Sequence, residues 1–156
     1  MPVIATSPLS VLLTVRSADL PSHAGQISFP GGKLEPEDTG PAAAAIREAR
    51  EEIGIEAPFI EPLGHLDWYR SATGYAISPL VGLVHPGYTL RPDPSEVTDV
   101  FEVPLAFLLD TANHQLHSRT WRGRERHYHA MPYGDRYIWG VTAGIIKNLH
   151  ERLTRT

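Results

Sequence analysis

Two short stretches decide the fold and the chemistry of this chain: residues 31–35, which read GGKLE, and residues 47–55, which read REAREEIGI. If the second stretch is helical, Glu48 and Glu52 lie close together at positions i and i+4, with Glu51 beside them. Like charges at this spacing cost a helix about 0.2–0.5 kcal/mol per pair. Most glutamate-rich helix faces are solvated surface, but Mg²⁺ prefers carboxylate oxygens and would remove this penalty. The pattern therefore indicates a platform for a hard divalent cation.

Both ends of this helix are signalled by single residues. Pro41 suits the first helical turn, and Gly54 suits the left-handed position just after the last turn. Between them an apolar stripe recurs at helical spacing and should pack against a sheet, formed by Ala42, Ile46, Ala49 and Ile53. The acids are expected to face away from this stripe. Arg47 and Glu51 also lie at i and i+4, so the arginine can orient one acid without filling the site.

This arrangement resembles the signature of the Nudix hydrolases, in which a glycine, an acid, Arg-Glu, Glu-Glu and a final glycine follow one another at set spacing. The matching residues are Gly32, Arg47, Glu48, Glu51, Glu52 and Gly54, with Ala49 and Ile55 at the apolar positions. Asp38 stands where the first acid is expected, but eight residues rather than seven separate it from Arg47. The resemblance implies a Nudix box at about residues 32–55 and a pyrophosphohydrolase.

A further resemblance narrows the family to its coenzyme A pyrophosphatase branch. Residues 12–17 (LLTVRS) and 23–32 (HAGQISFPGG) are similar to the additional signature of that branch. The Nudix box of this chain, which is longer by one residue, is also similar to that of the branch. The similarity continues through residues 101–105 and 137–140. Where the branch usually carries a basic residue, this chain has Pro21-Ser22. Members cleave the pyrophosphate of coenzyme A to 4′-phosphopantetheine and adenosine 3′,5′-bisphosphate.

Strand and helix signals in the rest of the chain predict an alternating α/β (α+β) protein. Short apolar and partly β-branched runs indicate five strands, at residues 11–15, 27–29, 59–70, 76–84 and 97–103. Pro79 suggests an edge or a bulge in the fourth of these. Residues 115–122 and 126–131 are typical of a hairpin. A short helical turn is expected over residues 104–109 and an amphipathic helix over residues 142–153.

The natural packing of these parts is a mixed β-sheet between helices. This agrees with the α/β/α sandwich that the Nudix resemblance implies. At 156 residues the chain fits a single domain, residues 1–156, with a real hydrophobic core.

Composition excludes several classes of function. The formal net charge of −4 argues against a general nucleic-acid binder. The absence of cysteine excludes disulfides and thiol catalysis, and no apolar run approaches the roughly 20 residues that span a bilayer. A cytoplasmic protein with a small-molecule substrate and no membrane partner is expected, as a monomer or a homodimer.

The expected chemistry starts from the cation. Pyrophosphate repels an incoming nucleophile through its own charge, and divalent ions neutralise that charge. Glu48 and Glu52 are the expected principal ligands of Mg²⁺ or Mn²⁺, with Glu51 contributing a further oxygen or acting as a base. The resemblance also implies that a glycine carbonyl, that of Gly32, completes the ligand shell, and it places Arg47 in the catalytic group.

Further acids compete for the role of base. Glu96 precedes the strand expected at residues 97–103, in a loop where Nudix enzymes often place a glutamate that binds metal or acts as a base. A solvated loop acid is an equal alternative. Glu35, Glu37 and Asp38 are expected to be solvated, although Asp38 could instead cap the start of the helix.

Substrate contacts are suggested by residues of the branch signature and by one basic cluster. Arg16, Gln26 and Ser28 are candidates for contacts with a phosphate or the nucleotide. The predicted hairpin gathers four arginines, Arg119, Arg122, Arg124 and Arg126. They could hold the 3′-phosphate of coenzyme A through bidentate contacts, and an exposed hairpin tip is an equal alternative.

Three functional hypotheses result. The first is a metal-dependent coenzyme A pyrophosphatase. The second is a Nudix hydrolase of another substrate, such as ADP-ribose, a dinucleotide or a nucleoside triphosphate, because loops rather than the motif select the substrate. The third is a nucleotide-binding module without catalysis, which the intact glutamates argue against.

Overall fold

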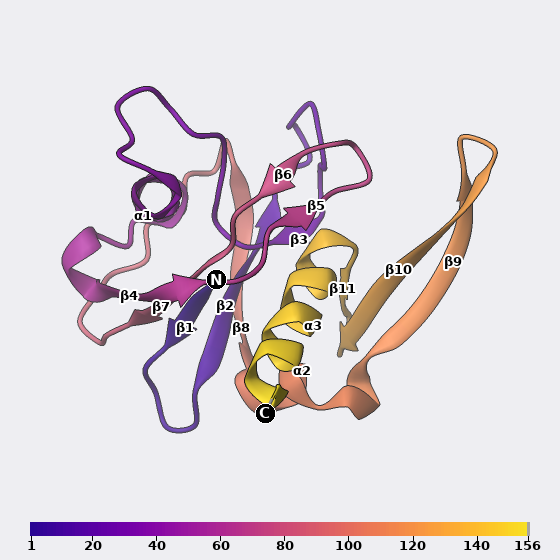
Figure 1. Cartoon of the computed structure of the whole chain (residues 1–156). Helices are drawn as coiled ribbons and strands as arrows, with labels where there is room; N and C mark the ends of the chain where they lie inside the picture. Colours follow the sequence, from indigo (N-terminus) through magenta and orange to yellow (C-terminus); the bar gives the residue numbers. More distant parts are fainter. Residues whose placement is uncertain (156) are drawn as a thin grey trace.

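The computed structural model describes residues 1–155, and its central element is a six-stranded sheet (Figure 1). The sheet contains β1 (Pro2–Ile4), β2 (Ser10–Arg16), β3 (Ile27–Ser28), β4 (Ile60–His65), β7 (Leu80–Val84) and β8 (Val97–Pro104). A second sheet contains β9 (Gln115–Trp121), β10 (Arg124–Tyr133) and β11 (Arg136–Trp139), and a short hairpin is formed by β5 (Tyr69–Arg70) and β6 (Ala76–Ile77). The helices are α1 (Pro41–Ile53), α2 (Leu105–Leu109) and α3 (Val141–Thr154), with 3₁₀ turns at Ala57–Phe59 and Thr111–Asn113.

The large sheet is mixed, as predicted. Its strands follow the order β3-β2-β1-β7-β4, and β8 pairs antiparallel along the length of β2. β1 pairs antiparallel with β2 and parallel with β7, where Val3 lies opposite Val11 and Leu83. The β2–β8 pair matters most for function, because it places the start of β8 beside the end of β2.

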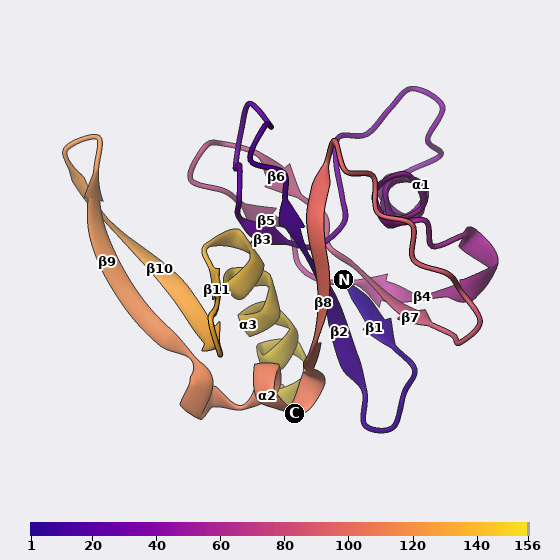
Figure 2. The same ribbon diagram turned by 180° about the vertical axis from the view of Figure 1, so that it is seen from behind.

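Helices cover both faces of this sheet, and alternation along β2 explains how. Leu12 packs in a cluster with Ile53 and Ile55 at the end of α1. Its neighbour Leu13 points to the opposite face, into a cluster that includes Ile146 of α3. Figures 1 and 2 show α1 and α3 on opposite sides of the sheet. The α/β/α sandwich is therefore confirmed.

The two predicted ends of α1 are also confirmed. Pro41 is the first helical residue, and Gly54 follows the last one with φ 77°, the left-handed conformation that glycine adopts without strain. The Gly54 N–H donates to the Arg50 carbonyl. Of the predicted apolar stripe, Ala49 and Ile53 are buried, while the residues nearer the start of the helix are only partly covered.

Several strand predictions are wrong in extent. The expected strand at residues 59–70 breaks after His65, and the one at residues 76–84 divides at Pro79, which has no N–H to donate to a ladder. β1 and β11 were not predicted, because three or four residues carry too little periodicity to be recognised. The predicted hairpin is present as β9 and β10, and it projects from the rest of the molecule in both views (Figures 1 and 2).

Within residues 1–155, no helix has both the length and the apolar character that crossing a bilayer requires.

Candidate active site

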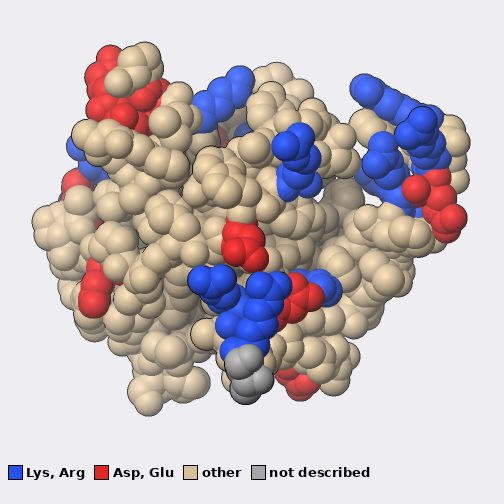
Figure 3. Space-filling model, viewed as in Figure 1, with Lys and Arg blue, Asp and Glu red and all other residues tan. Residues whose placement is uncertain are grey.

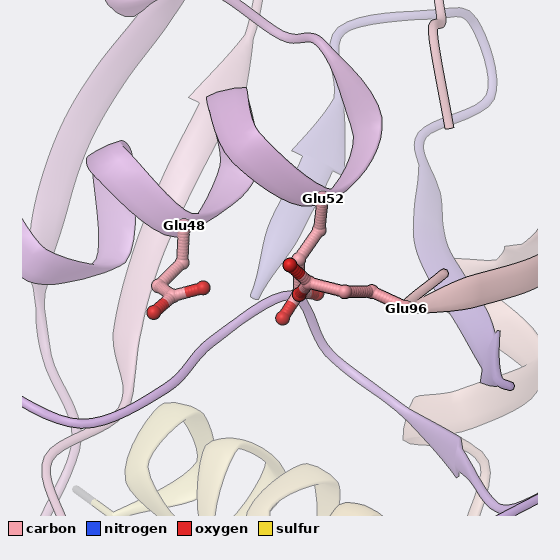
Figure 4. Close-up of side chains that lie close together, drawn as sticks. All are labelled: Glu48, Glu52 and Glu96. Carbon is pink, nitrogen blue, oxygen red and sulfur yellow. The ribbon is translucent and has the colours of Figure 1, made fainter. Parts of the chain in front are cut away.

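Three glutamates from two separate elements meet at one point (Figure 4). Glu48 and Glu52 project from α1, and Glu96 lies just before β8. One carboxylate oxygen from each residue can be chosen so that all three atoms lie within 4.8 Å of one another. The side chain of Glu52 is nearly inaccessible, with the residue 4% exposed. The structure therefore brings Glu96, which could equally have been a solvated loop acid, to the pair on α1.

Backbone hydrogen bonds explain why Glu96 lies there. The Arg91 N–H donates to the Ile53 carbonyl at 2.8 Å, and the Asp93 N–H donates to the Glu52 carbonyl at 2.9 Å. The Glu96 N–H in turn donates to the Asp93 carbonyl at 3.0 Å. Residues 91–96 are thus tied to the last turn of α1, the same turn that carries Glu52.

The glycine turn approaches the cluster closely at one residue. A Cβ atom added to Gly32 would lie 2.7 Å from the carboxyl carbon of Glu48, closer than real Cβ contacts allow. A Cβ added to Gly31 would meet nothing within 4 Å. A side chain at residue 32 would therefore displace the Glu48 carboxylate from its observed position. This close approach fits the prediction that the Gly32 carbonyl contributes a ligand oxygen.

Burial and mutual repulsion shift the pKa values of the two helix acids. Burial raises the pKa of Glu52 to about 8, with smaller contributions from the charges of Glu48 and Glu96, while the charge of Arg16 acts in the opposite direction. Burial also raises the pKa of Glu48, against the stabilising contact with Arg47. A cluster of oxygen donors that resists ionisation without a counterion suits a hard divalent cation.

The burial of Glu52 is a feature that the helical spacing of the acids did not indicate. Its neighbour Ile53 is fully buried, and Glu52 is covered as well. The reason is nonlocal: Gly31 and the loop at residues 91–96 lie against Glu52 and exclude water from it. Helical periodicity describes one helix face and carries no information about what a distant loop will cover.

Arg47 holds several of the neighbouring acids. Its guanidinium lies 3.1 Å from Glu48 and 3.1 Å from Glu51, and it donates to the Lys33 carbonyl at 3.1 Å. The predicted i, i+4 pair with Glu51 is present. The Glu51 carboxylate therefore contacts the Arg47 guanidinium, and the Glu51 side chain is 43% exposed. Glu51 is not among the three acids that form the cluster. Its role as a ligand or base stays a prediction.

Asp38 is the residue that sequence reasoning placed wrongly. Its side chain is only 6% exposed, and it accepts two hydrogen bonds from Arg47, at 3.0 Å from Nε and 2.9 Å from a terminal nitrogen. This bidentate contact lowers the pKa of the Asp38 carboxyl. It does not cap α1, whose first turn receives no side-chain cap. Glu35 and Glu37 are exposed, as predicted.

The side chains of the three candidate substrate-contact residues differ in whether they already have hydrogen-bond partners within the protein. The Arg16 N–H donates to the Gln26 carbonyl, so the ends of β2 and β3 meet. The Arg16 Nε is buried and has no hydrogen-bond partner among residues 1–155. By contrast, the Gln26 side-chain oxygen lies 2.9 Å from His23 Nδ1, and the Ser28 hydroxyl lies 3.4 Å from that of Thr14. Of these three candidates, Arg16 also acts on the cluster through its charge, which opposes the rise in the pKa of Glu52.

Two positioning roles were not predicted, that of Asp38 as the partner of Arg47 and that of Asp93. The first could have been found by accepting a shifted acid in the signature and pairing it with Arg47. The second acts through its backbone N–H and carbonyl, and its side-chain oxygen also accepts hydrogen bonds from the Ser95 N–H and hydroxyl. The Asp-Pro-Ser run at residues 93–95 is a turn signal that could have indicated this loop.

The α/β/α sandwich thus carries a cluster of three carboxylates that could hold a metal ion. The family model for the NUDIX domain matches residues 3–124 of the chain. The chain therefore belongs to the Nudix family and is a Nudix pyrophosphohydrolase.

The curated relatives agree with this family. The chain is 40% identical to the Nudix hydrolase NudL of Photorhabdus laumondii, described as uncharacterized, over 98% of this chain and 82% of that protein. It is 38% identical to NudL of Escherichia coli strain K12, also described as uncharacterized, over 96% of this chain and 78% of that protein.

Solved structures share the fold. The NUDIX domain of Shewanella oneidensis NrtR, complexed with ADP ribose, aligns with a TM-score of 0.56 at 22% identity, over 98% of this chain and 85% of that one. A C. elegans Ap4A hydrolase, solved as a binary complex, aligns with a TM-score of 0.57 at 16% identity, over 67% of this chain and 76% of that one.

Proposed function

We propose that this protein hydrolyses the pyrophosphate bond of coenzyme A or its derivatives to 4′-phosphopantetheine and adenosine 3′,5′-bisphosphate. The observation that carries the chemistry is the meeting of Glu48, Glu52 and Glu96 within 4.8 Å. The substrate rests on the resemblance of residues 12–32 to the coenzyme A pyrophosphatase branch. Two parts of that segment, Arg16 and the glycine turn, adjoin the cluster.

The residues that would hold the cation are Glu48, Glu52 and the Gly32 carbonyl. Bound Mg²⁺ or Mn²⁺ would neutralise the charge of the pyrophosphate and make water a better nucleophile. Arg47 is a positioning residue in this proposal, because it fixes Glu48 and Glu51 through its guanidinium. The Arg16 guanidinium, whose charge acts on Glu52, would donate a charge-assisted hydrogen bond to a phosphate oxygen.

In the reaction, a water oxygen forms a bond to one phosphorus atom while the bridging P–O bond breaks. Glu96 accepts the proton of that water, since it reaches the cluster and yet comes from a separate loop. Glu51, held by Arg47, is the alternative acceptor. Replacing each residue with glutamine in turn separates these two roles. The variant that lacks the true base loses the ascending limb of the pH–rate profile, and the other variant keeps it.

The direct test is a substrate panel. The protein is incubated with Mg²⁺ or Mn²⁺ and with coenzyme A, ADP-ribose or dATP, and the products are identified by mass. Coenzyme A should yield the two products named above. Rapid hydrolysis of ADP-ribose or dATP with coenzyme A untouched would contradict the proposed substrate and favour the second hypothesis. ADP-ribose belongs in the panel because the NrtR NUDIX domain was solved with it.

A further inference from the structure

The projecting hairpin of β9 and β10 forms one wall of a hollow that the catalytic chemistry does not use. The hollow has a volume of about 340 Å³ and is lined by Ala72, Thr73, Trp121, Arg122, Arg124 and Arg126. Three of these six residues are arginines. We propose that this hollow, the hairpin pocket, is a second anion site that binds the phosphate group of a nucleotide.

The charge in the hairpin pocket is not neutralised by the protein. None of Arg122, Arg124 and Arg126 lies within 4.0 Å of a side-chain carboxylate in the described residues 1–155, whereas Arg47 contacts four acids. Figure 3 shows blue atoms gathered over the projecting hairpin, beside a hollow in the surface, with a smaller group of red atoms at the outer edge of the hairpin. In a chain of net charge −4, this is a local concentration of positive charge that a dianion can satisfy.

Aromatic contacts hold the guanidinium groups of the hairpin pocket. The Arg122 guanidinium lies 4.5 Å from the ring centroid of Trp121, and that of Arg126 lies 5.8 Å from the same ring. Stacking on an aromatic face restricts a planar guanidinium, so less freedom is lost when it binds a phosphate through two parallel hydrogen bonds. The arginines are therefore partly arranged for a ligand before it arrives.

The backbone conformation at the tip of the hairpin also supports a ligand site. Arg122 and Gly123 form its two-residue loop and have φ values of 50° and 73°. Both central residues of such a loop need positive φ, and asparagine, aspartate or glycine is the usual choice. Arginine rarely adopts this left-handed backbone conformation, so the backbone is strained at Arg122. The strain places one more guanidinium at the rim of the pocket.

The opposite wall of the hairpin pocket connects to the active site. Ala72 and Thr73 belong to the turn between β5 and β6, which also carries Tyr75. The Lys33 ammonium lies 5.8 Å from the centroid of the Tyr75 ring, and Lys33 follows Gly32. In Figures 1 and 2 this turn lies between α1 and the tip of the hairpin, at the same end of the molecule.

The ligand chemistry is a phosphomonoester dianion, and it has two sources. One is the 3′-phosphate of a coenzyme A substrate, a case that rests on the proposed function. The other is a separate nucleotide that binds beside the reaction.

Binding is measured first, without catalysis. Adenosine 3′,5′-bisphosphate is titrated by calorimetry into protein kept free of metal with EDTA, with adenosine as the ligand lacking phosphate. The double variant Arg124→Gln/Arg126→Gln should weaken binding of the bisphosphate by at least tenfold. The matched control Arg152→Gln/Arg155→Gln removes the same charge from exposed positions near Asp67 and should bind like the unmodified protein.

Each binding result decides the proposal. Unchanged affinity in the hairpin variant, equal weakening in the control, or equal binding of adenosine and the bisphosphate would overturn it. Both variants are checked for native circular dichroism, and the single variants Arg124→Gln and Arg126→Gln serve if the double variant unfolds.

Kinetics then separates the two sources. A rise in the KM for coenzyme A in the hairpin variant, with kcat and the KM for dephospho-coenzyme A unchanged, identifies the substrate's own 3′-phosphate. Loss of binding with both KM values unchanged identifies a separate nucleotide. If coenzyme A is not cleaved at all, the proposed function fails, and the binding result still decides the hairpin pocket.

Discussion

Two regions of this molecule gather like charges, and they do so in opposite ways. The carboxylates of Glu48, Glu52 and Glu96 meet in a covered place that backbone hydrogen bonds hold together. The arginines of the hairpin pocket stand on an exposed arm. Burial raises the pKa of Glu52 because no water compensates its charge, whereas the exposed arginines keep their solvent. A buried cluster of like charges therefore requires its counterion, while an exposed one requires shape to select a ligand.

The largest effect is expected from Glu52→Gln, which removes a charge from the buried cluster. The variant should lose turnover by about 10³-fold or more, since several kcal/mol of charge stabilisation are at stake and each 1.4 kcal/mol is tenfold. Steady-state kinetics with saturating Mg²⁺ measures the loss. Glu56→Gln, an exposed acid just beyond α1, is the matched control. Near-native turnover in folded Glu52→Gln would remove the metal assignment.

The next effect concerns how Arg47 positions the acids. Arg47→Lys should lower kcat by about 10- to 100-fold, the usual cost of losing a partner that orients a metal ligand, because lysine cannot make the bidentate contact with Asp38. Asp38→Asn should lower kcat in the same direction. The double variant should lose less than the product of the two single losses. Strictly multiplicative losses would show that Asp38 and Arg47 act independently.

A smaller effect is expected from the glycine turn. Gly32→Ala should weaken Mn²⁺ binding by about tenfold, since the added Cβ displaces the Glu48 carboxylate and perturbs the ligand shell. Titration of Mn²⁺ followed by electron paramagnetic resonance measures this directly. Gly31→Ala, where a Cβ meets nothing within 4 Å, is the control and should bind normally. Equal affinity in the two variants would leave the close approach at residue 32 without consequence.

The smallest effect is a pH dependence of stability. The pKa of Glu52 is about 8 in the folded protein against an ordinary value of 4.5, so the folded state holds the proton more tightly. The protonated Glu52 therefore contributes to the free energy of unfolding. This contribution is complete below about pH 4.5 and is lost as the pH rises through 8. In EDTA, the Tm of the unmodified protein minus that of Glu52→Gln should therefore fall by several degrees over that range, at about 2–4 °C per kcal/mol. A flat difference would contradict the burial of a repelled charge, and saturating Mn²⁺ should restore the Tm at pH 8.

Local signals predicted the fold and the pair of acids on α1 well. Pro41, Gly54 and the helical spacing of Glu48 and Glu52 are properties of a few neighbouring residues, and the structure agrees with them. The mixed sheet followed from the order of apolar runs. What failed were strand limits at Pro79 and the shortest strands, where tertiary pairing decides.

Contacts between distant segments could not be predicted. Whether Glu96 was a ligand or a solvated acid depended on hydrogen bonds between residues 91–93 and the end of α1. The burial of Glu52 depended on the same loop, and the burial of Asp38 depended on Arg47 reaching back across the glycine turn. Sequence spacing within one helix contains none of this information.

The two backbone hydrogen bonds that join residues 91 and 93 to the end of α1 determine where residues can be inserted into this chain. Residues added among 85–90, before the first of these bonds, would form a larger loop and leave the spacing from Asp93 to Glu96 intact. A single residue inserted between Asp93 and Glu96 would shift the carboxylate out of register with its partners on the helix. We therefore expect insertions within residues 85–90 to leave activity intact and an insertion between Asp93 and Glu96 to abolish it. The first segment is then the place where loop length can be engineered without moving the Glu96 carboxylate.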